Sequence, residues 1–346
     1  MDSILRLMDM YLSSDKIMNS VFKIKNYVMK IKIGLILVFA QLIICAAYGQ
    51  QDVQYTQFMH NKTALNAGYA GSTGVPCLNA LYRNQWSGFE GAPISQSLSF
   101  QMPVFKDRVG LGMTMVHDKL GPSESWKVAM MYSYHIDLGK AKLGVGLQGS
   151  LQNYRVRWDQ TDATQANDLL IPDNASSSRF IPNFGAGLYL HSENYYVGLS
   201  VPHLLKSELS FVERQFRVEG INKAEVHAFL MGGIIFKVNN MLRIKPAGLI
   251  KYVKNAPLDF DLHTSLIFYD QFWLGATYRA GGDLLSNAGE SIDAIVQLQL
   301  NEAIRVGFAY DFTLTEIKDY TAGSFEILLD YCFHYNGKRL TNPRFF

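Results

Sequence analysis

The sequence lacks the long apolar runs by which helices cross membranes. Although 48% of its 346 residues are hydrophobic, no stretch after residue 50 approaches the roughly eighteen unbroken apolar residues that such a helix needs. A bundle of membrane-spanning helices is therefore excluded, and the apolar residues must be distributed over short elements. A soluble β protein and a membrane β-barrel remain as alternatives.

Cysteine is scarce, and neither sign of charge is in excess. Only Cys77 and Cys332 lie after residue 50, too few for a disulfide framework or a zinc site. The 32 basic and 30 acidic residues leave a net charge of +2 without a basic cluster, so no nucleic acid is expected as a partner. No glycine-rich phosphate loop follows a strand-like segment, and no cofactor or metal is predicted.

The start of the chain has the pattern of a secretory signal. Lys30 and Lys32 precede the apolar stretch 33–47, and the small residues Ala47 and Gly49 stand where a signal peptidase reads. We predict cleavage after Gly49. We interpret Met29 as the true start of translation and residues 1–28 as an upstream stretch wrongly included in the sequence (an over-called start), so residues 1–49 are absent from the mature protein. The alternative is a cytoplasmic arm before an uncleaved anchor.

From residue 78 to residue 335 the chain divides into about fourteen strand-like segments, and their connections alternate between short and long. The tight ones are 101–108, 135–142, 191–195, 237–242, 268–272 and 300–303, and the longer polar ones are 87–93, 118–125, 157–178, 203–224, 253–258, 281–289 and 313–323. Such parity is typical of an up-and-down barrel with short periplasmic turns and longer extracellular loops. We predict an all-β fold, a transmembrane antiparallel β-barrel over residues 77–335.

Alternate positions along the strand-like segments differ in character. Phe308 and Tyr310, for example, alternate with Ala309 and Asp311. A soluble barrel would show the same pattern, but the signal, the loop parity and the 13% of aromatic residues favour the outer membrane, with the apolar face against lipid. The alternation is weak over 224–237, where we expect a bulge or a shifted register.

Two polar segments flank the predicted barrel. Residues 50–76 have no strand period and are expected in the periplasm or the lumen, and residues 336–346 are expected to form a periplasmic tail. An even number of strands puts both termini in the periplasm. The segments either plug the barrel or form a docking face. The candidate partner-binding residues are Tyr55, Phe58, Tyr69, Lys338, Arg339, Arg344, Phe345 and Phe346.

Few residues are candidates for chemistry, and no catalytic residue is predicted. His117 and Asp118 are adjacent in a strand-like segment, so they point to opposite faces and cannot by themselves make a catalytic pair. His263 shares one face with Asp259 and Asp261, where a solvated ion network is favoured over a metal.

The lumen and the barrel seam carry two further expectations. Charged side chains on the lumen face, Arg83, Asp311 and Glu326 among them, are expected to interlock as ion pairs, as in a filled barrel. Cys77 precedes the first strand-like segment and Cys332 lies near the inner end of the last one. These two segments must pair in a closed barrel. Either the two cysteines form a disulfide there, or they are unrelated.

Short blocks of sequence follow one another along the chain: QFM at 57–59, NAGYAGS at 66–72, RNQW at 83–86, GAP at 91–93, YYVGLSVPH at 195–203, WLGATYR at 273–279, AYD at 309–311, GSFEI at 323–327 and NPRFF at 342–346. Together they resemble the PorP/SprF family of the type IX secretion system. Two positions depart from it: the family usually has Pro where Ala67 stands and His where Phe325 stands.

The resemblance implies a non-enzymatic outer-membrane barrel subunit of gliding or type IX-secreting Bacteroidota. Relatives bind a periplasmic peptidoglycan-associated lipoprotein of the secretion machine, or help a cognate surface adhesin to reach the cell surface and stay there. The implied partners are outer-membrane lipids, such a lipoprotein and a secreted adhesin. The alternatives are a porin-like solute channel and a barrel hydrolase that uses His117 and Asp118.

Overall fold

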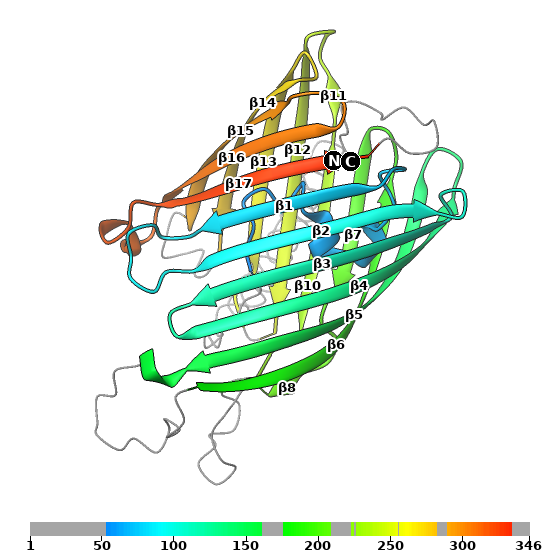
Figure 1. Cartoon of the computed structure of the whole chain (residues 1–346). Helices are drawn as coiled ribbons and strands as arrows, with labels where there is room; N and C mark the ends of the chain where they lie inside the picture. The colour runs from blue at the N-terminus through cyan, green and yellow to red at the C-terminus, as the bar shows by residue number, and fades with distance from the viewer. Residues whose placement is uncertain are drawn as a thin grey trace, which may run out of the picture. The chain divides into compact units, whose positions relative to one another are not determined.

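The computed structural model describes residues 53–160, 176–208, 223–224, 226–254, 256–281 and 289–333. The predicted signal and over-called start, residues 1–49, and the tail 336–346 lie outside these ranges. The described residues form a wall of antiparallel strands around a lumen (Figure 1). Within these ranges no helix is long and apolar enough to cross a membrane.

Two short helices precede the wall, the α-helix α2 (Lys62–Leu65) and the 3-10 helix η1 (Ala67–Tyr69). The first strands are β1 (Cys77–Asn84), β2 (Ile94–Val104), β3 (Val109–Leu120), β4 (Ser123–Asp137), β5 (Lys142–Arg157), β6 (Ser176–His191) and β7 (Tyr195–Val201). The later ones are β10 (His227–Ile234), β11 (Phe236–Lys237), β12 (Leu242–Val253), β13 (Asp259–Phe268), β14 (Phe272–Ala280), β15 (Ser291–Gln299), β16 (Ile304–Thr313) and β17 (Ser324–Cys332). A separate pair is formed by β8 (Ser207–Glu208) and β9 (Lys223–Ala224), and the 3-10 helices η2 (Trp158–Gln160) and η4 (Glu316–Asp319) lie in connections.

The strands close into a barrel. Neighbours along the chain pair antiparallel, β1 pairs with β17, and β10 pairs with both β7 and β12. Fourteen strands of the described part make the wall, with β11 as a continuation of β10. The sheet closes on itself, as a lipid environment requires, although the β6–β7 ladder covers only residues 186–191 of β6. The prediction of an up-and-down antiparallel barrel of about fourteen strands is confirmed.

A disulfide closes the seam between the first and last strands. Cys77 stands opposite Cys332 in the β1–β17 ladder, and the two are bonded with their Cα atoms 4.0 Å apart. The sequence had left this bond open against two unrelated cysteines, and the structure shows the bond.

The two rims of the barrel differ in loop length. One, the short-turn rim, has the connections 105–108, 138–141, 192–194, 238–241, 269–271 and 300–303. The other, the long-loop rim, has 85–93, 158–175, 202–226, 254–258, 281–290 and 314–323. One long loop expected from the sequence, 118–125, is wrong. Only Gly121 and Pro122 join β3 to β4, because the ladder between these strands continues to Leu120 and Ser123.

Side chains follow the two expected faces. On β16, Phe308 is 48% exposed while Ala309 is fully buried. Large apolar side chains such as Met130 and Leu147 are likewise exposed on the outside, at 66% and 63%. An apolar outer surface of this extent is stable against lipid and not against water.

The lumen face of β10 carries large apolar side chains. Phe229 and Met231 are buried there, and they share a cluster with Phe58 and Leu65 of the segment that precedes β1. The register of β10 and β11 with β12 is continuous, so the part of this region that the structure describes in the ladder, residues 227–237, has no bulge or shifted register. The alternation is weak because these inward side chains pack against another part of the chain instead of facing water.

Strand length varies around the barrel. β4, β5 and β6 have 15, 16 and 16 residues, whereas β13, β16 and β17 have 10, 10 and 9. About 9–11 residues suffice to cross a membrane, so β4 to β6 extend beyond the hydrocarbon layer. Figure 1 shows these long strands in teal and green.

Candidate functional site

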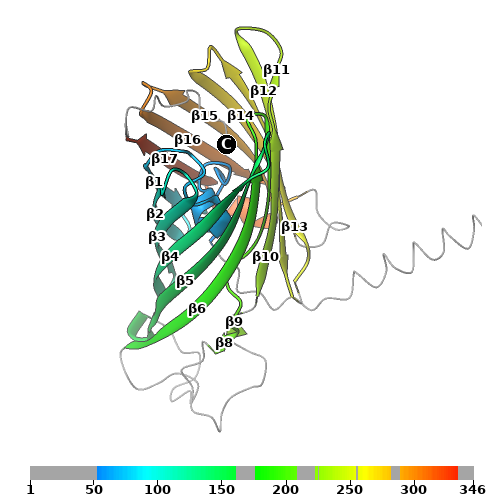
Figure 2. The ribbon, with the colours of Figure 1, turned by 90° about the vertical axis from the view of Figure 1, so that its right-hand side faces the viewer.

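Residues 53–76, which we call the lumenal segment, lie inside the barrel. Figure 2 shows this part of the chain in blue between the strands of opposite walls. Phe58, Met59 and Ala70 are at most 2% exposed. The two alternatives for this segment were the periplasm and the lumen, and its described residues occupy the lumen.

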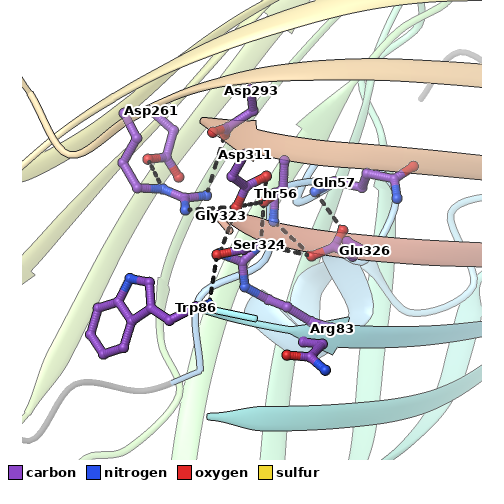
Figure 3. A network of polar contacts seen from close by, with 12 residues as sticks. Thr56, Gln57, Arg83, Trp86, Asp261, Asp293, Asp311, Gly323, Ser324 and Glu326 are labelled. Atoms are coloured by element: carbon purple, nitrogen blue, oxygen red, sulfur yellow. Dashed lines mark hydrogen bonds and ion pairs between the residues drawn. The ribbon is translucent and has the colours of Figure 1, made fainter. Parts of the chain in front are cut away.

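A carboxylate on the wall holds the backbone of the lumenal segment (Figure 3). Glu326 on β17 accepts hydrogen bonds from the backbone N–H groups of Thr56 and Gln57, at 2.9 and 2.8 Å. Asp311 on β16 accepts one from the Thr56 hydroxyl at 2.9 Å. All four residues are at most 1% exposed. Charged acceptors make the stronger hydrogen bonds, so they fix this end of the segment.

Arg83 on β1 compensates the two carboxylates. Its guanidinium lies 2.7 Å from Asp311 and 3.6 Å from Glu326, and it also donates to the Thr56 hydroxyl. A buried carboxylate without a cation is penalised by several kcal/mol, so the three charges are stable only together. We call Arg83, Asp311 and Glu326 the clamp.

A second arginine extends the network along neighbouring strands of the wall, and Figure 3 labels three of the carboxylates that it approaches, Asp261, Asp293 and Asp311. Arg279 on β14 lies 3.1 Å from Asp261 and 3.8 Å from Asp311. It also lies 3.9 Å from Asp293 on β15. Lys251 on β12 is 3.1 Å from Asp261. The charges of the clamp and of this second group therefore interlock as ion pairs, as expected for a filled barrel.

The middle of the lumenal segment supplies apolar side chains. Phe58 and Leu65 pack in one buried cluster with Phe229 and Leu249 of the wall. Full burial of a side chain such as Phe58 contributes about 1.5–3 kcal/mol. The segment is thus held by packing as well as by the clamp.

Lys62 of α2 lies among tyrosine rings. Its Nζ is 4.2 Å from the ring centroid of Tyr196 and 5.0 Å from that of Tyr69, and it donates to the Tyr189 hydroxyl at 3.2 Å. Ring faces stabilise the cation. Burial, followed by the nearby charge of Arg305, lowers the pKa of Lys62 to about 7. The charge of this side chain therefore changes near neutral pH.

The turn around η1 touches the wall at backbone distance. Asn66 caps η1 by accepting a hydrogen bond from the backbone N–H of Gly68 at 2.8 Å. A Cβ on Gly68 would come within 2.8 Å of the Gly144 carbonyl oxygen. One on Gly110 of β3 would overlap the Ala70 carbonyl. The block at 66–72 therefore packs directly against the backbone of the wall, and the contact needs glycine both in the turn and on the strands.

Polar side chains of β4 complete this contact. His135 donates from Nε2 to the Ala70 carbonyl at 2.8 Å, and Ser133 donates to the Gly68 carbonyl at 3.1 Å. Buried carbonyl groups need such partners. The turn is thus matched to the wall in hydrogen bonding as well as in shape.

The lumenal segment runs from the long-loop end of the lumen to the short-turn rim. Val53 and Gln54 line a cavity of about 420 Å³ at the long-loop end, together with Trp86 and Thr313. The other end of the segment continues into Cys77, the first residue of β1. The two termini of the chain lie outside the described residues, and the periplasmic side of the C-terminus stays a prediction. Val53, the first described residue, lies at the long-loop end and not at the short-turn end expected for an N-terminus in the periplasm.

The structure separates the candidate partner-binding residues into two groups. Tyr55, Phe58 and Tyr69 are 6%, 1% and 8% exposed and belong to the cluster that packs the lumenal segment against the wall. The candidates in the tail lie outside the described residues, and their role stays a prediction. They are Lys338, Arg339, Arg344, Phe345 and Phe346.

His117 and Asp118 do not form a catalytic pair. The His117 ring faces outward, with Nε2 2.9 Å from Glu124 and the ring stacked on Trp126. Asp118 accepts a hydrogen bond from the Ser95 hydroxyl at 2.5 Å. A hydroxyl relay needs the imidazole between the hydroxyl and the carboxylate, and here Ser95 and Asp118 meet without it.

The histidine on β13 has protein partners. His263 contacts the hydroxyls of Thr277 and Ser265 at 2.9 and 2.5 Å. Asp261 is paired with Lys251 and Arg279. Among the residues that the structure describes, no group of His, Cys, Asp and Glu could hold a metal ion.

Sequence reasoning placed Arg83, Asp311 and Glu326 in the lumen but did not connect them to Thr56 and Gln57. A signal for this connection was present in the quoted blocks. Four of these blocks meet at the clamp. The blocks at 83–86, 309–311 and 323–327 contain its three residues, and the block at 57–59 contains Gln57, whose backbone N–H group Glu326 binds.

This arrangement defines a class of protein, the outer-membrane β-barrel whose lumen is occupied by the chain's own N-terminal segment. A family model described as type IX secretion system membrane protein PorP/SprF matches residues 47–331. The chain belongs to this family, and the resemblance seen in the sequence blocks is confirmed.

Several solved outer-membrane structures are similar to the chain. The toluene transporter TbuX of Ralstonia pickettii is 9% identical, with 80% of this chain and 94% of that chain covered and a TM-score of 0.48. A FadL homologue of Pseudomonas aeruginosa is 12% identical, with 75% and 90% covered and a TM-score of 0.42. Omp33 of Acinetobacter baumannii is 8% identical, with 75% and 98% covered and a TM-score of 0.43. No curated protein matches the chain.

Proposed function

We propose that the protein is a non-enzymatic, non-conducting barrel subunit of the type IX secretion machinery. In this role it anchors or exports a cognate surface adhesin, binds a periplasmic peptidoglycan-associated lipoprotein, or does both. The observation that carries the proposal is the lumenal segment held by the clamp. A barrel filled in this way acts through its rims and its surface, and family membership supports the link to secretion.

The proposal assigns the periplasm to the short-turn rim and the outside to the long-loop rim, as is usual for outer-membrane barrels. Single-cysteine labelling of intact cells at Asp168 and at Lys338 tests this orientation. Labelling at Asp168 alone is expected. Labelling at Lys338 alone would reverse the orientation.

Lipoprotein binding is assigned to the tail 336–346. A machine powered from the inner membrane reaches only the periplasmic rim. Arginine and aromatic side chains dominate many interfaces, and Arg344, Phe345 and Phe346 are of these types. Deleting residues 341–346 should leave an inserted, heat-modifiable barrel and reduce the lipoprotein recovered by pull-down from detergent with mass spectrometry.

A six-residue Gly/Ser extension after Phe346 is the control, and it should leave recovery unchanged. If the truncated barrel inserts and its partners co-purify normally, the tail is not the docking site. Failure to insert would make the tail an assembly element.

The rival function is a porin-like channel, and conductance distinguishes the two. In planar bilayers the intact protein should show no steady open level, because the lumenal segment occupies the lumen. A steady conductance of the intact protein would overturn the non-conducting role and favour solute transport.

A further inference from the structure

The lipid-facing surface ends in basic side chains on one side of the barrel. Lys119 of β3 and Arg155 of β5 are exposed near the long-loop rim, and each stands opposite Glu124 of β4 in the ladder. Arg157, two positions further along β5, has a nitrogen 3.6 Å from Glu124. We call Lys119, Arg155 and Arg157 the basic step. Its three cations face one carboxylate, so this surface is positively charged.

The basic step lies just beyond the apolar band of the barrel. Trp126, two residues from Glu124 on the same face of β4, is 45% exposed and stacks on His117 with ring centroids 4.2 Å apart. Tryptophan is typical of the membrane–water interface. Two strand residues span about 7 Å, and about 5 Å along the normal of a tilted strand. The headgroup layer is roughly 5–7 Å thick, so the basic step lies at headgroup depth.

The basic step lies on β3 and β5, the two neighbours of the long strand β4. On the opposite side of the barrel, the outward positions Ile292 of β15 and Phe312 of β16 near the same rim are apolar, at 48% and 54% exposure. Among the described residues, neither Lys119 nor Arg155 forms an ion pair. Their charges are therefore available to a ligand.

We propose that the basic step binds phosphate groups of lipid headgroups in the leaflet at the long-loop rim. The guanidinium of Arg155 matches the bidentate geometry of a phosphate, and Lys119 adds a point charge on the other side of Glu124. The phosphate is carried either by lipid A or by a glycerophospholipid. Binding there would fix the depth of β4 and β5 in the membrane.

Native mass spectrometry of the purified protein tests the proposal. The protein is titrated in micelles with monophosphoryl lipid A, phosphatidylglycerol or zwitterionic phosphatidylcholine. The first two should be retained over the third, and the one retained more strongly identifies the source of the phosphate. Each cation removed should lower retention about five-fold, since a cation near an anionic surface contributes about 1 kcal/mol.

The double variant Lys119→Gln with Arg155→Gln should lose most of this preference. A charge-matched control, Lys140→Gln with Lys318→Gln, removes two exposed lysines from connections instead of lipid-facing strands and should keep it. Equal anionic-lipid retention by the double variant and the wild type would overturn the proposal.

Removing the carboxylate gives a test in the opposite direction. Glu124→Gln raises the charge of the surface by one and should increase anionic-lipid retention, an effect that misfolding would not produce. No increase in a heat-modifiable Glu124→Gln barrel would overturn the proposal even if the double variant failed to fold.

Discussion

Replacing Glu326 by alanine should release the first part of the lumenal segment. The change leaves the buried backbone N–H groups of Thr56 and Gln57 without their acceptor. An unsatisfied buried donor costs about 1–3 kcal/mol, so the two together cost about 2–6 kcal/mol. Arg83 still has Asp311 as a partner at 2.7 Å, so its buried charge stays paired and adds little to this cost. At about 1.4 kcal/mol per factor of ten, the detached population should rise at least about thirty-fold.

Hydrogen exchange with mass spectrometry measures this release directly. Peptides covering residues 53–61 should exchange faster in Glu326→Ala, while peptides from β5 stay protected. Glu326→Gln keeps one acceptor oxygen and should give an intermediate rate. Asp330→Asn, which changes another β17 carboxyl that makes no hydrogen bond to the backbone of the segment, is the matched control. Unchanged exchange over 53–61 in a folded Glu326→Ala barrel would refute the role of the clamp.

Three further predictions concern docking, pH and lipid contact. Gly110→Val should expel the turn after η1, because a side chain there overlaps the Ala70 carbonyl; Gly149→Val, whose Cβ meets nothing within 4 Å, should not. Limited proteolysis over residues 66–71 compares the two. Stability should rise between about pH 7 and 10.5, because Lys62 has a pKa of about 7 in the folded state and 10.5 ordinarily, so the unfolded chain holds the extra proton in that window. The temperature midpoint of the heat-modifiability shift measures this stability. In Lys62→Met the midpoint should rise less over the same pH range. Phe308→Arg should hinder insertion at a cost of about 2–4 kcal/mol at mid-bilayer, and insertion equal to that of Phe308→Leu would contradict the lipid-facing assignment.

The barrel could be predicted from the sequence because lipid imposes a strict alternation on each strand. Phe308 and Ala309 show this pattern in both sequence and structure. The loop expected at 118–125 was wrong because a strand that continues into water and a polar loop have the same composition. Asp118 and Ser125 are in fact paired with each other in the β3–β4 ladder.

The contacts of the site were harder to predict than its charges. Arg83 and Glu326 could be placed in the lumen by alternation alone. Their partner is the backbone at Thr56, 270 residues from Glu326, and a backbone N–H group leaves no mark in the sequence. The apolar side chains on the lumen face of β10 were also hard to interpret. They pack against Phe58 of the lumenal segment, and their sequence does not reveal a partner so far away along the chain.

The enclosed segment has a consequence for the order of assembly. The lumenal segment precedes β1 in the chain and contacts the wall both at β17, through Glu326, and at β3, through Gly110. A sheet that is still open between β1 and β17 admits the segment sideways, whereas a closed one admits it only by threading along the axis. Cys77 and Cys332 become neighbours only when that gap closes. The oxidation state of these two thiols therefore reports how many molecules have completed their enclosure, and alkylation during biogenesis would separate open intermediates from finished barrels.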